Sequence, residues 1–86
     1  MKKLNFDKSA DKMLNRLDKP TRHRVVNAIL GLLDEPPKGD IKSLKGELRG
    51  LHRLRIGNWR VTYEATEESI NILSVTSRGG AYKKGV

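Results

Sequence analysis

The alternation of apolar and polar positions predicts a short strand and then a helix at the start of the chain. Leu4 and Phe6 alternate with polar residues from Lys2 to Phe6, a period of two that is typical of a strand. Asp7 or Ser9 can cap the helix that follows. The apolar positions of this helix recur at spacings of three and four residues, at Ala10, Met13, Leu14 and Leu17.

A second helix is predicted to begin at Pro20 and to end before Pro36-Pro37. Lys19-Pro20 breaks the first helix, and proline suits the first position of the next one. The apolar stripe of the second helix is broad and consists of Val25, Val26, Ile29, Leu30, Leu32 and Leu33. The outer faces of both helices are basic and are expected to be solvated, with Lys12, Arg16, Arg22 and Arg24. The short break predicts an antiparallel helical hairpin whose stripe faces a sheet.

Three stretches of alternating residues in the second half predict an antiparallel meander. They cover about residues 48–56, 58–65 and 69–75, after a loop rich in lysine and glycine over residues 38–50. Gly57-Asn58 is typical of a two-residue hairpin turn with positive φ at its first position. The sequence therefore predicts an α+β fold with a short N-terminal strand, an antiparallel helical hairpin and a three-stranded antiparallel meander.

The turns fix which residues face one another. The first hairpin pairs Ile56 with Trp59, Arg55 with Arg60, Leu54 with Val61 and Arg53 with Thr62. A second turn at residues 66–69 pairs Tyr63 with Ile72 and Val61 with Ser74. The face expected under the helices carries Ile72, Tyr63, Val61, Leu54 and Trp59. The other face carries Arg53, Arg55, Arg60, Thr62, Leu73 and Val75.

The arginines on this second face predict an anionic ligand. Like charges directly opposite one another destabilise a strand pair, so a chain that places Arg55 beside Arg60, with Arg53 near them, is expected to bind an anion there. The net charge of +8 and the isoelectric point near 10.1 favour a polyanionic partner, either nucleic acid or an acidic protein.

Two basic segments flank the meander, and each has two interpretations. Lys42, Lys45 and Arg49 either extend a phosphate-binding surface or belong to an ordinary connector. Arg78 and Tyr82 either complete a pocket, with the tyrosine stacked on a base, or belong to a frayed tail.

Length and composition narrow the protein class. With 86 residues, the chain is expected to be a single domain over residues 1–86. It has no cysteine, and His23 and His52 are not spaced as metal ligands, so no metal or other cofactor is expected. No apolar stretch approaches the roughly 20 residues of a membrane-spanning helix, and the N-terminal segment lacks the apolar core of a secretion signal. A cytoplasmic location is therefore expected.

The order of elements, together with three motifs, resembles the RelE/ParE superfamily of bacterial toxins from type II toxin–antitoxin pairs. The motifs are DIKSLKG at residues 40–46, HRLRIGNWRVTY at residues 52–63, and Arg78 with Tyr82. The resemblance spans essentially the whole chain and implies helices on one side of a twisted antiparallel sheet, with the opposite face as the working surface. In this superfamily, RelE-like toxins cleave messenger RNA in the ribosomal A site, and ParE-like toxins inhibit DNA gyrase.

The resemblance implies a cleavage site and leaves its general base open. The residues that match the RelE-like site are Arg53, Arg55, Arg60, Arg78 and Tyr82. Some relatives have lysines in place of the first two, and many have a histidine, two arginines and an aspartate where this chain has Ser77-Arg78-Gly79-Gly80. Arginine stays protonated and is a poor acceptor for the proton of the ribose 2′-hydroxyl. A ribosomal group could take this proton instead, or alignment of the substrate could supply most of the rate. His52 is expected on the helix side as a packed or hydrogen-bonded residue.

The favoured interpretation is a toxin that acts as a ribosome-dependent, metal-independent endoribonuclease. Arg53, Arg55 and Arg60 are expected to hold the scissile phosphate, Arg78 to donate a proton or clamp a phosphate, and Tyr82 to stack on a base. The alternatives are a gyrase inhibitor without nuclease activity and a non-catalytic relative that binds RNA or the ribosome. The expected partners are the ribosome, messenger RNA and an acidic cognate antitoxin in a hetero-oligomer.

Overall fold

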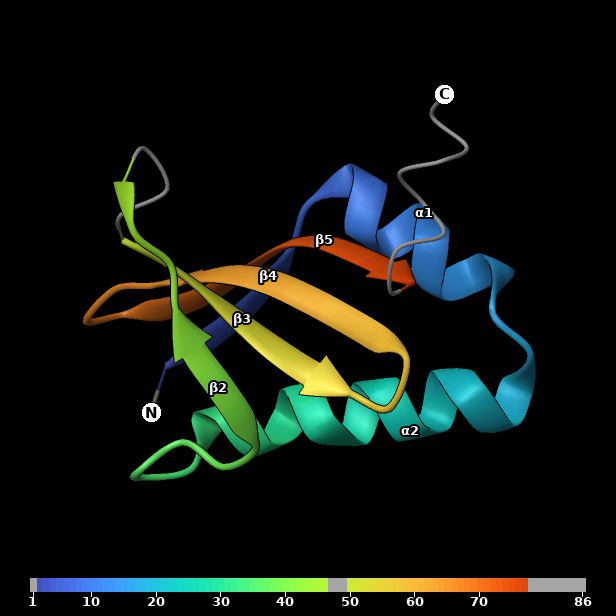
Figure 1. Cartoon of the computed structure of the whole chain (residues 1–86), viewed down its shortest axis with the longest axis horizontal. Helices are drawn as coiled ribbons and strands as arrows, with labels where there is room; N and C mark the ends of the chain where they lie inside the picture. The colour runs from blue at the N-terminus through green and yellow to red at the C-terminus, as the bar shows by residue number, and fades with distance from the viewer. Residues whose placement is uncertain (1, 47–49, 78–86) are drawn as a thin grey trace.

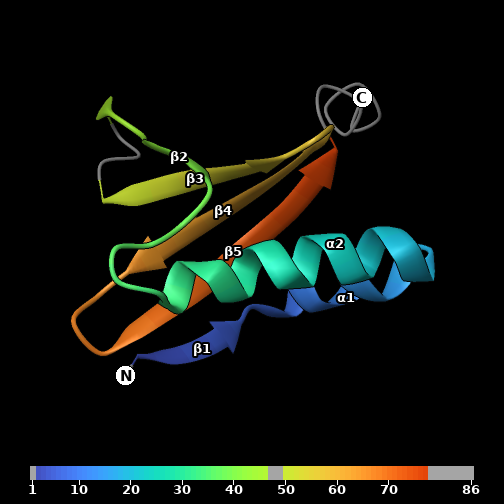
Figure 2. The same cartoon turned by 90° about the horizontal axis from the view of Figure 1, so that it is seen from below.

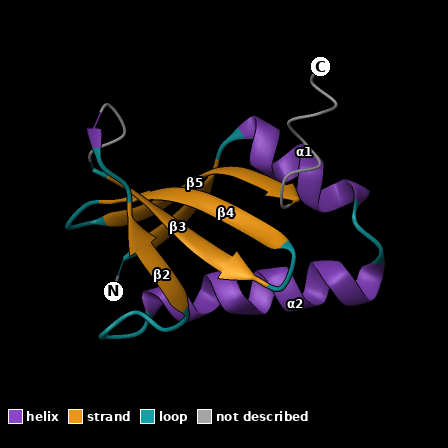
Figure 3. Cartoon of the chain, in the orientation of Figure 1, coloured by secondary structure: helices purple, strands orange, loops and turns teal. Residues whose placement is uncertain are grey.

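The computed structural model describes residues 2–46 and 50–77, which form two α-helices, a 3₁₀ turn and five strands (Figures 1 and 3). The elements are β1 (Lys3–Phe6), α1 (Lys8–Arg16), α2 (Lys19–Leu30), η1 (Gly31–Leu33), β2 (Asp40–Ser43), β3 (Leu51–Ile56), β4 (Trp59–Ala65) and β5 (Ser69–Ser77). The predicted α+β class, helical hairpin and three-stranded meander are confirmed.

Both helices begin at an aspartate that caps the first turn. Asp7 accepts a hydrogen bond from the backbone N–H of Ser9 at 3.3 Å, and Asp18 accepts one from the N–H of Thr21 at 3.2 Å. Hydrogen bonding to Thr21 lowers the pKa of Asp18 from its ordinary value. Within the described part of the chain, no helix has the length and apolar character needed to span a membrane.

The α-helical part of the second helix is shorter than predicted. α2 ends at Leu30, and the backbone N–H of Gly31 bonds to the carbonyl of Ala28 as the chain tightens into η1. Leu32 in this 3₁₀ turn is buried. The predicted apolar stripe therefore continues past the point where the α-helix ends.

The strands form one sheet in the order β1-β5-β4-β3-β2. β1 lies parallel to β5, whereas the other neighbouring strands are antiparallel. The helical hairpin between β1 and β2 carries the chain across one face of the sheet, so α1 and α2 lie on the same side of it (Figure 2). In the part of the chain that the structure describes, no helix covers the opposite face of the sheet.

The loop predicted before β3 contains a strand, which corrects the sequence interpretation. β2 is antiparallel to β3, with Asp40 opposite Arg55 and Lys42 opposite Arg53. Only Ile41 of its four residues packs against the core. One apolar position gives no period, so the alternation that predicts strands could not reveal this one.

Gly39 sets the point at which β2 begins. Its φ is +123°, a conformation that side chains rarely adopt. A Cβ at this position would lie 2.6 Å from Cδ1 of Leu54, because the glycine backbone packs directly on that side chain. The close contact fixes the start of β2 against β3.

The hydrophobic core lies between the helices and the sheet. Its buried side chains come from both helices, η1 and the three meander strands: Ala10, Leu14, Val25, Ile29, Leu32, Leu54, Val61, Tyr63, Ile70, Ile72 and Val75. Trp59 is half-buried and packs against this cluster. The helix-side face predicted from alternation is therefore confirmed.

A β-bulge in β5 corrects the predicted register beyond Tyr63. Tyr63 pairs with Ile72 as predicted, but the next pair is Thr62 with Ser74, which leaves Leu73 as an extra residue on β5. The predicted pairing of Val61 with Ser74 is therefore wrong.

The bulge also changes which side chains of β5 face the helices. The hydroxyl of Ser9 donates a hydrogen bond to the carbonyl of Leu73 at 3.0 Å, so the start of α1 holds the bulge in place. Val61 pairs with Val75, which is 2% exposed in the core rather than on the arginine side as predicted. Ser74 and Thr76 take the outward positions that alternation assigned to apolar residues.

Candidate functional site

The face of the sheet without helices carries the predicted arginines. Leu54 and Val61 point toward the helices and are buried. Successive strand residues point to opposite faces, so Arg53, Arg55 and Arg60 lie on the other side. We call this surface the arginine face; it comprises Asp40, Lys42, Arg53, Arg55, Arg60, Thr62, Ser74 and Thr76.

The arginine face consists of two rows of cross-strand neighbours. The first row runs across the sheet through Thr76, Arg60, Arg55 and Asp40. The second row runs through Ser74, Thr62, Arg53 and Lys42. Side chains directly opposite one another have Cβ atoms about 4.5–5.5 Å apart. The predicted hairpin register is confirmed, and Gly57 at the first turn position has a φ of +60°.

Two of the three guanidinium groups are partly buried and carry an unpaired donor. The Nε atoms of Arg53 and Arg60 are buried and have no hydrogen-bond partner among the described residues, and Arg55 is exposed. Among the described residues, the ion pair within 4.0 Å is that of Lys38 with Asp34. None of the three arginines therefore lies within 4.0 Å of a described carboxylate. Forked guanidinium donors match the oxygens of a phosphate. The arrangement is suited to holding a phosphodiester.

Hydroxyl groups border the arginines where alternation predicted apolar side chains. Ser74 and Thr76 lie opposite Thr62 and Arg60 because of the bulge in β5. Hydroxyls can donate hydrogen bonds to phosphate oxygens. The bulge therefore makes this end of the arginine face polar.

A hydrogen-bonded row of two asparagines and a glutamate marks the limit of the arginine face. Asn5 donates to Asn71 at 2.9 Å, and Asn71 donates to the carboxylate of Glu64 at 3.0 Å. Glu64 lies opposite Leu51 and next to the row that contains Arg53. Its hydrogen bond to Asn71 occupies one of its carboxylate oxygens.

The predicted substrate-binding and tail residues have different placements. Lys42 belongs to the arginine face, and Lys45 is exposed in the connection that follows β2. Arg49, Arg78 and Tyr82 lie outside the described residues. The structure thus brings Arg53, Arg55, Arg60 and Lys42 together.

The sequence pattern does not predict three groups on the arginine face. Asp40 lies in a segment predicted as a loop, because β2 has only one core residue. Ser74 and Thr76 face outward because of the bulge in β5, which has no signal in the alternation.

Arg24 of α2 reaches the tip of the β3–β4 hairpin. A Cβ on Gly57 would lie 2.8 Å from Nη2 of Arg24, so the guanidinium rests on the turn. Arg24 is exposed, as the sequence pattern predicts for the outer helix surface, and its guanidinium lies beside the turn.

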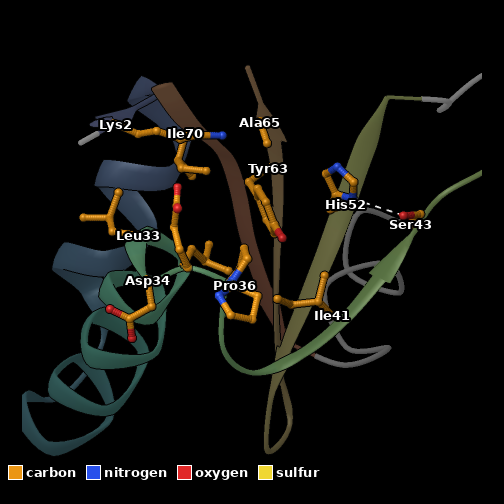
Figure 4. A pocket seen from close by; sticks show the side chains of 13 residues that line it. Lys2, Leu33, Asp34, Pro36, Ile41, Ser43, His52, Tyr63, Ala65 and Ile70 are labelled. Atoms are coloured by element: carbon orange, nitrogen blue, oxygen red, sulfur yellow. Dashed lines mark hydrogen bonds between the residues drawn. The ribbon is translucent and has the colours of Figure 1, made fainter. Parts of the chain in front are cut away.

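His52 lies on the helix side of the sheet, as predicted. Its Nδ1 shares a hydrogen bond of 3.2 Å with the hydroxyl of Ser43, and its ring centroid lies 5.2 Å from that of Tyr63 (Figure 4). It is therefore separated from the arginine face by the sheet. Across the described residues, no three histidine, aspartate or glutamate side chains are grouped to hold a metal ion.

A mainly apolar groove of about 960 Å³ lies beside His52 (Figure 4). One wall comes from η1 and the segment after it, with Leu33 and Pro36, and the other from the sheet, with Ile41 and Tyr63. Burial raises the pKa of the Tyr63 phenol. The groove is on the helix side, so it is distinct from the arginine face.

One protein family matches nearly the whole chain. The family described as the ParE toxin of the type II toxin–antitoxin system, parDE, matches residues 4–82. No curated protein matches the sequence.

Solved structures of similar fold come from several organisms. In the toxin–antitoxin complex RelBE2 of Mycobacterium tuberculosis, a chain is 28% identical with a TM-score of 0.76, over 90% of this chain and 98% of that one. In the RelB–RelE antitoxin–toxin complex of Methanococcus jannaschii, a chain is 26% identical with a TM-score of 0.74, over 93% and 96%. The isolated RelE toxin of E. coli, at 20% identity and a TM-score of 0.75 over 99% and 95%, is similar in fold.

Proposed function

Since the chain belongs to the ParE toxin family of type II toxin–antitoxin systems, within the RelE/ParE superfamily, we propose that it is a RelE-like endoribonuclease. In this proposal it acts in the cytoplasm and cleaves messenger RNA in the ribosomal A site without a metal ion. The observation that carries the proposal is the pair Arg55 and Arg60, which face each other beside Arg53 on the side of the sheet without helices.

The arginine face suits the charge that develops during RNA cleavage. The ribose 2′-oxygen attacks the adjacent phosphorus in line, the bond from phosphorus to the 5′-oxygen breaks, and the products are a 2′,3′-cyclic phosphate and a 5′-hydroxyl. Negative charge builds up on the phosphoryl oxygens in this step. Arg53, Arg55 and Arg60 supply guanidinium donors that stabilise it.

The remaining predicted residues have supporting roles in this proposal. Lys42, Lys45 and Arg49 contact neighbouring phosphates, which positions the strand without reading its sequence. Arg78 donates a proton to the leaving oxygen or clamps a second phosphate, and Tyr82 stacks on a base. The ribosome holds the message in line, so naked RNA is expected to be cleaved poorly.

Purified protein added to ribosomes programmed with a short message tests the proposal. We expect cut message whose new ends are a cyclic phosphate and a 5′-hydroxyl, with little cutting of the same RNA without ribosomes. An intact message, with the protein bound to the ribosome, would instead support a non-catalytic relative.

Inhibition of DNA gyrase is the second candidate function, because the matching family is described as the ParE toxin of parDE. In that case the basic sheet would serve as a protein-binding surface and no RNA would be cut. Gyrase supercoiling of a relaxed plasmid, measured with increasing toxin, separates the two functions. We expect supercoiling to be unaffected by this protein.

We also propose that the protein pairs with an acidic antitoxin. The similar chains from M. tuberculosis and M. jannaschii were solved in toxin–antitoxin complexes. The arginine face and the net charge of +8 would attract an acidic, amphipathic segment that folds as it binds. A small acidic protein encoded next to this one, which co-purifies with it and suppresses its toxicity, is the expected finding.

A further inference from the structure

We propose that Asp40 is the general base that takes the proton from the attacking 2′-hydroxyl. The inference rests on the proposed ribonuclease function and names the group that the arginines cannot supply. Guanidinium groups stay protonated at neutral pH and have no acceptor. A proton acceptor must therefore come from another side chain, from the ribosome or from solvent.

Asp40 lies in the same row as the arginine pair. It is directly opposite Arg55, which is directly opposite Arg60. Cross-strand neighbours on one face have Cβ atoms about 4.5–5.5 Å apart. A phosphate held by Arg55 and Arg60 would place its attached ribose within reach of a side chain at the end of this row.

The backbone holds Asp40 in this place. Gly39 packs against Cδ1 of Leu54, the residue before Arg55, and Ile41 packs against the core. These two neighbours anchor β2 on both sides of Asp40. The Asp40 side chain itself is exposed and forms no ion pair within 4.0 Å among the described residues, so its carboxylate is able to accept a proton.

Among the described residues, Asp40 is the carboxylate that lies in either of the two arginine rows, at the end of the first one. Glu64 lies in the next row and is hydrogen-bonded to Asn71. His52 is on the opposite side of the sheet and bonded to Ser43. Opposite charges on neighbouring strands stabilise a sheet, so Asp40 also offsets the repulsion between Arg55 and Arg60. Its exposed carboxylate, at the end of their row, is the described proton acceptor that lies beside the proposed phosphate site.

Each proton in the proposed cleavage step has a donor and an acceptor. The 2′-hydroxyl proton moves to the Asp40 carboxylate as the 2′-oxygen forms its bond to phosphorus. The bond from phosphorus to the 5′-oxygen breaks, and the leaving oxygen takes a proton from water. Asp40 then releases its proton to solvent and is ready for another turnover.

Asp40→Asn tests the inference, because asparagine keeps the shape and cannot take the proton. Single-turnover cleavage on programmed ribosomes is expected to slow by at least about a hundredfold, the usual contribution of a general base. Ribosome binding by the same variant is expected to be unchanged or tighter, since a negative charge has been removed from the arginine face.

Asp40→Glu and Glu67→Gln are the controls. Asp40→Glu restores a carboxylate and is expected to recover part of the rate. Glu67→Gln removes a carboxylate in the β4–β5 turn and is expected to cleave like the wild type. An Asp40→Asn protein that is folded by circular dichroism and cleaves at the wild-type rate would overturn the inference while the proposed function stands. A wild type that cuts no message would overturn both.

Discussion

Arg55 of β3 lies directly opposite Arg60 of β4 on the side of the sheet that has no helix. Two cations in these positions repel each other. The Nε atom of Arg60 is also buried without a hydrogen-bond partner among the described residues. The fold therefore retains an unfavourable arrangement at the site where the proposed ligand would neutralise it.

The first prediction is that the pair of Arg55 and Arg60 lowers the free energy of unfolding. Arg60→Met keeps an apolar stem of similar length and removes both the charge and the unpaired donor. We expect the free energy of unfolding to rise by roughly 1 kcal/mol, measured by urea denaturation, while toxicity is lost. Lys12→Met on the exposed side of α1 is the control, with an expected change within about 0.5 kcal/mol. A less stable Arg60→Met protein would contradict the proposed strain.

The second prediction uses salt to count phosphate contacts. Each cation that neutralises a phosphate of single-stranded RNA contributes about 0.7 to the slope of log affinity against log salt. Replacing Arg53 or Arg55 by alanine is expected to reduce the slope of RNA binding by about 0.7 each, measured by fluorescence anisotropy. An unchanged slope would mean that the arginine does not contact a phosphate.

The third prediction tests how β2 is positioned. Gly39→Ala introduces a Cβ into Cδ1 of Leu54 at a positive φ, so we expect a loss of more than about 2 kcal/mol in the free energy of unfolding. Gly46 has a φ of +70°, and among the described residues no atom lies within 4 Å of the Cβ that Gly46→Ala would add. Gly46→Ala should lower the free energy of unfolding by only about 1 kcal/mol, for the left-handed backbone conformation of the alanine. If thermal melts show the same loss of stability for both variants, Gly39 is not tightly packed.

Much of the fold was accessible from the sequence because it depends on local patterns. The turn at Gly57 fixes the β3–β4 register without help from the rest of the chain. Leu54, Val61 and Tyr63 are buried, as their alternation predicts. The arginines could be placed together for the same reason, because they share this hairpin.

Strand β2 and the bulge in β5 could not be predicted from the sequence, because both depend on contacts between residues that are distant along the chain. β2 has one core residue, Ile41, and is a strand because β3 provides its hydrogen-bond partners. The bulge at Leu73 is held by Ser9, which is 64 positions away in the chain. The positions of Asp40 and Thr76 on the arginine face depend on these contacts and could not be predicted from local sequence patterns.

The fourth prediction tests that distant contact. Ser9→Ala removes the hydroxyl that bonds to the carbonyl of Leu73 and to the Asp7 carboxylate. The hydrogen bond from the backbone N–H at position 9 to Asp7, which caps α1, remains. We expect a loss of about 1 kcal/mol in unfolding free energy and faster amide hydrogen exchange in β5. Unchanged exchange around Leu73 would indicate that β4 alone maintains the bulge.

The most direct test of the central claim is the single-turnover cleavage of a ribosome-bound message by the double variant Arg53→Ala, Arg60→Ala. Loss of donors to the phosphoryl oxygens is expected to slow cleavage by at least about a hundredfold. The double variant Lys12→Ala, Arg16→Ala removes the same net charge from α1 and is expected to cleave like the wild type. Wild-type cleavage by a folded Arg53→Ala, Arg60→Ala protein would show that the arginine face does not hold the scissile phosphate.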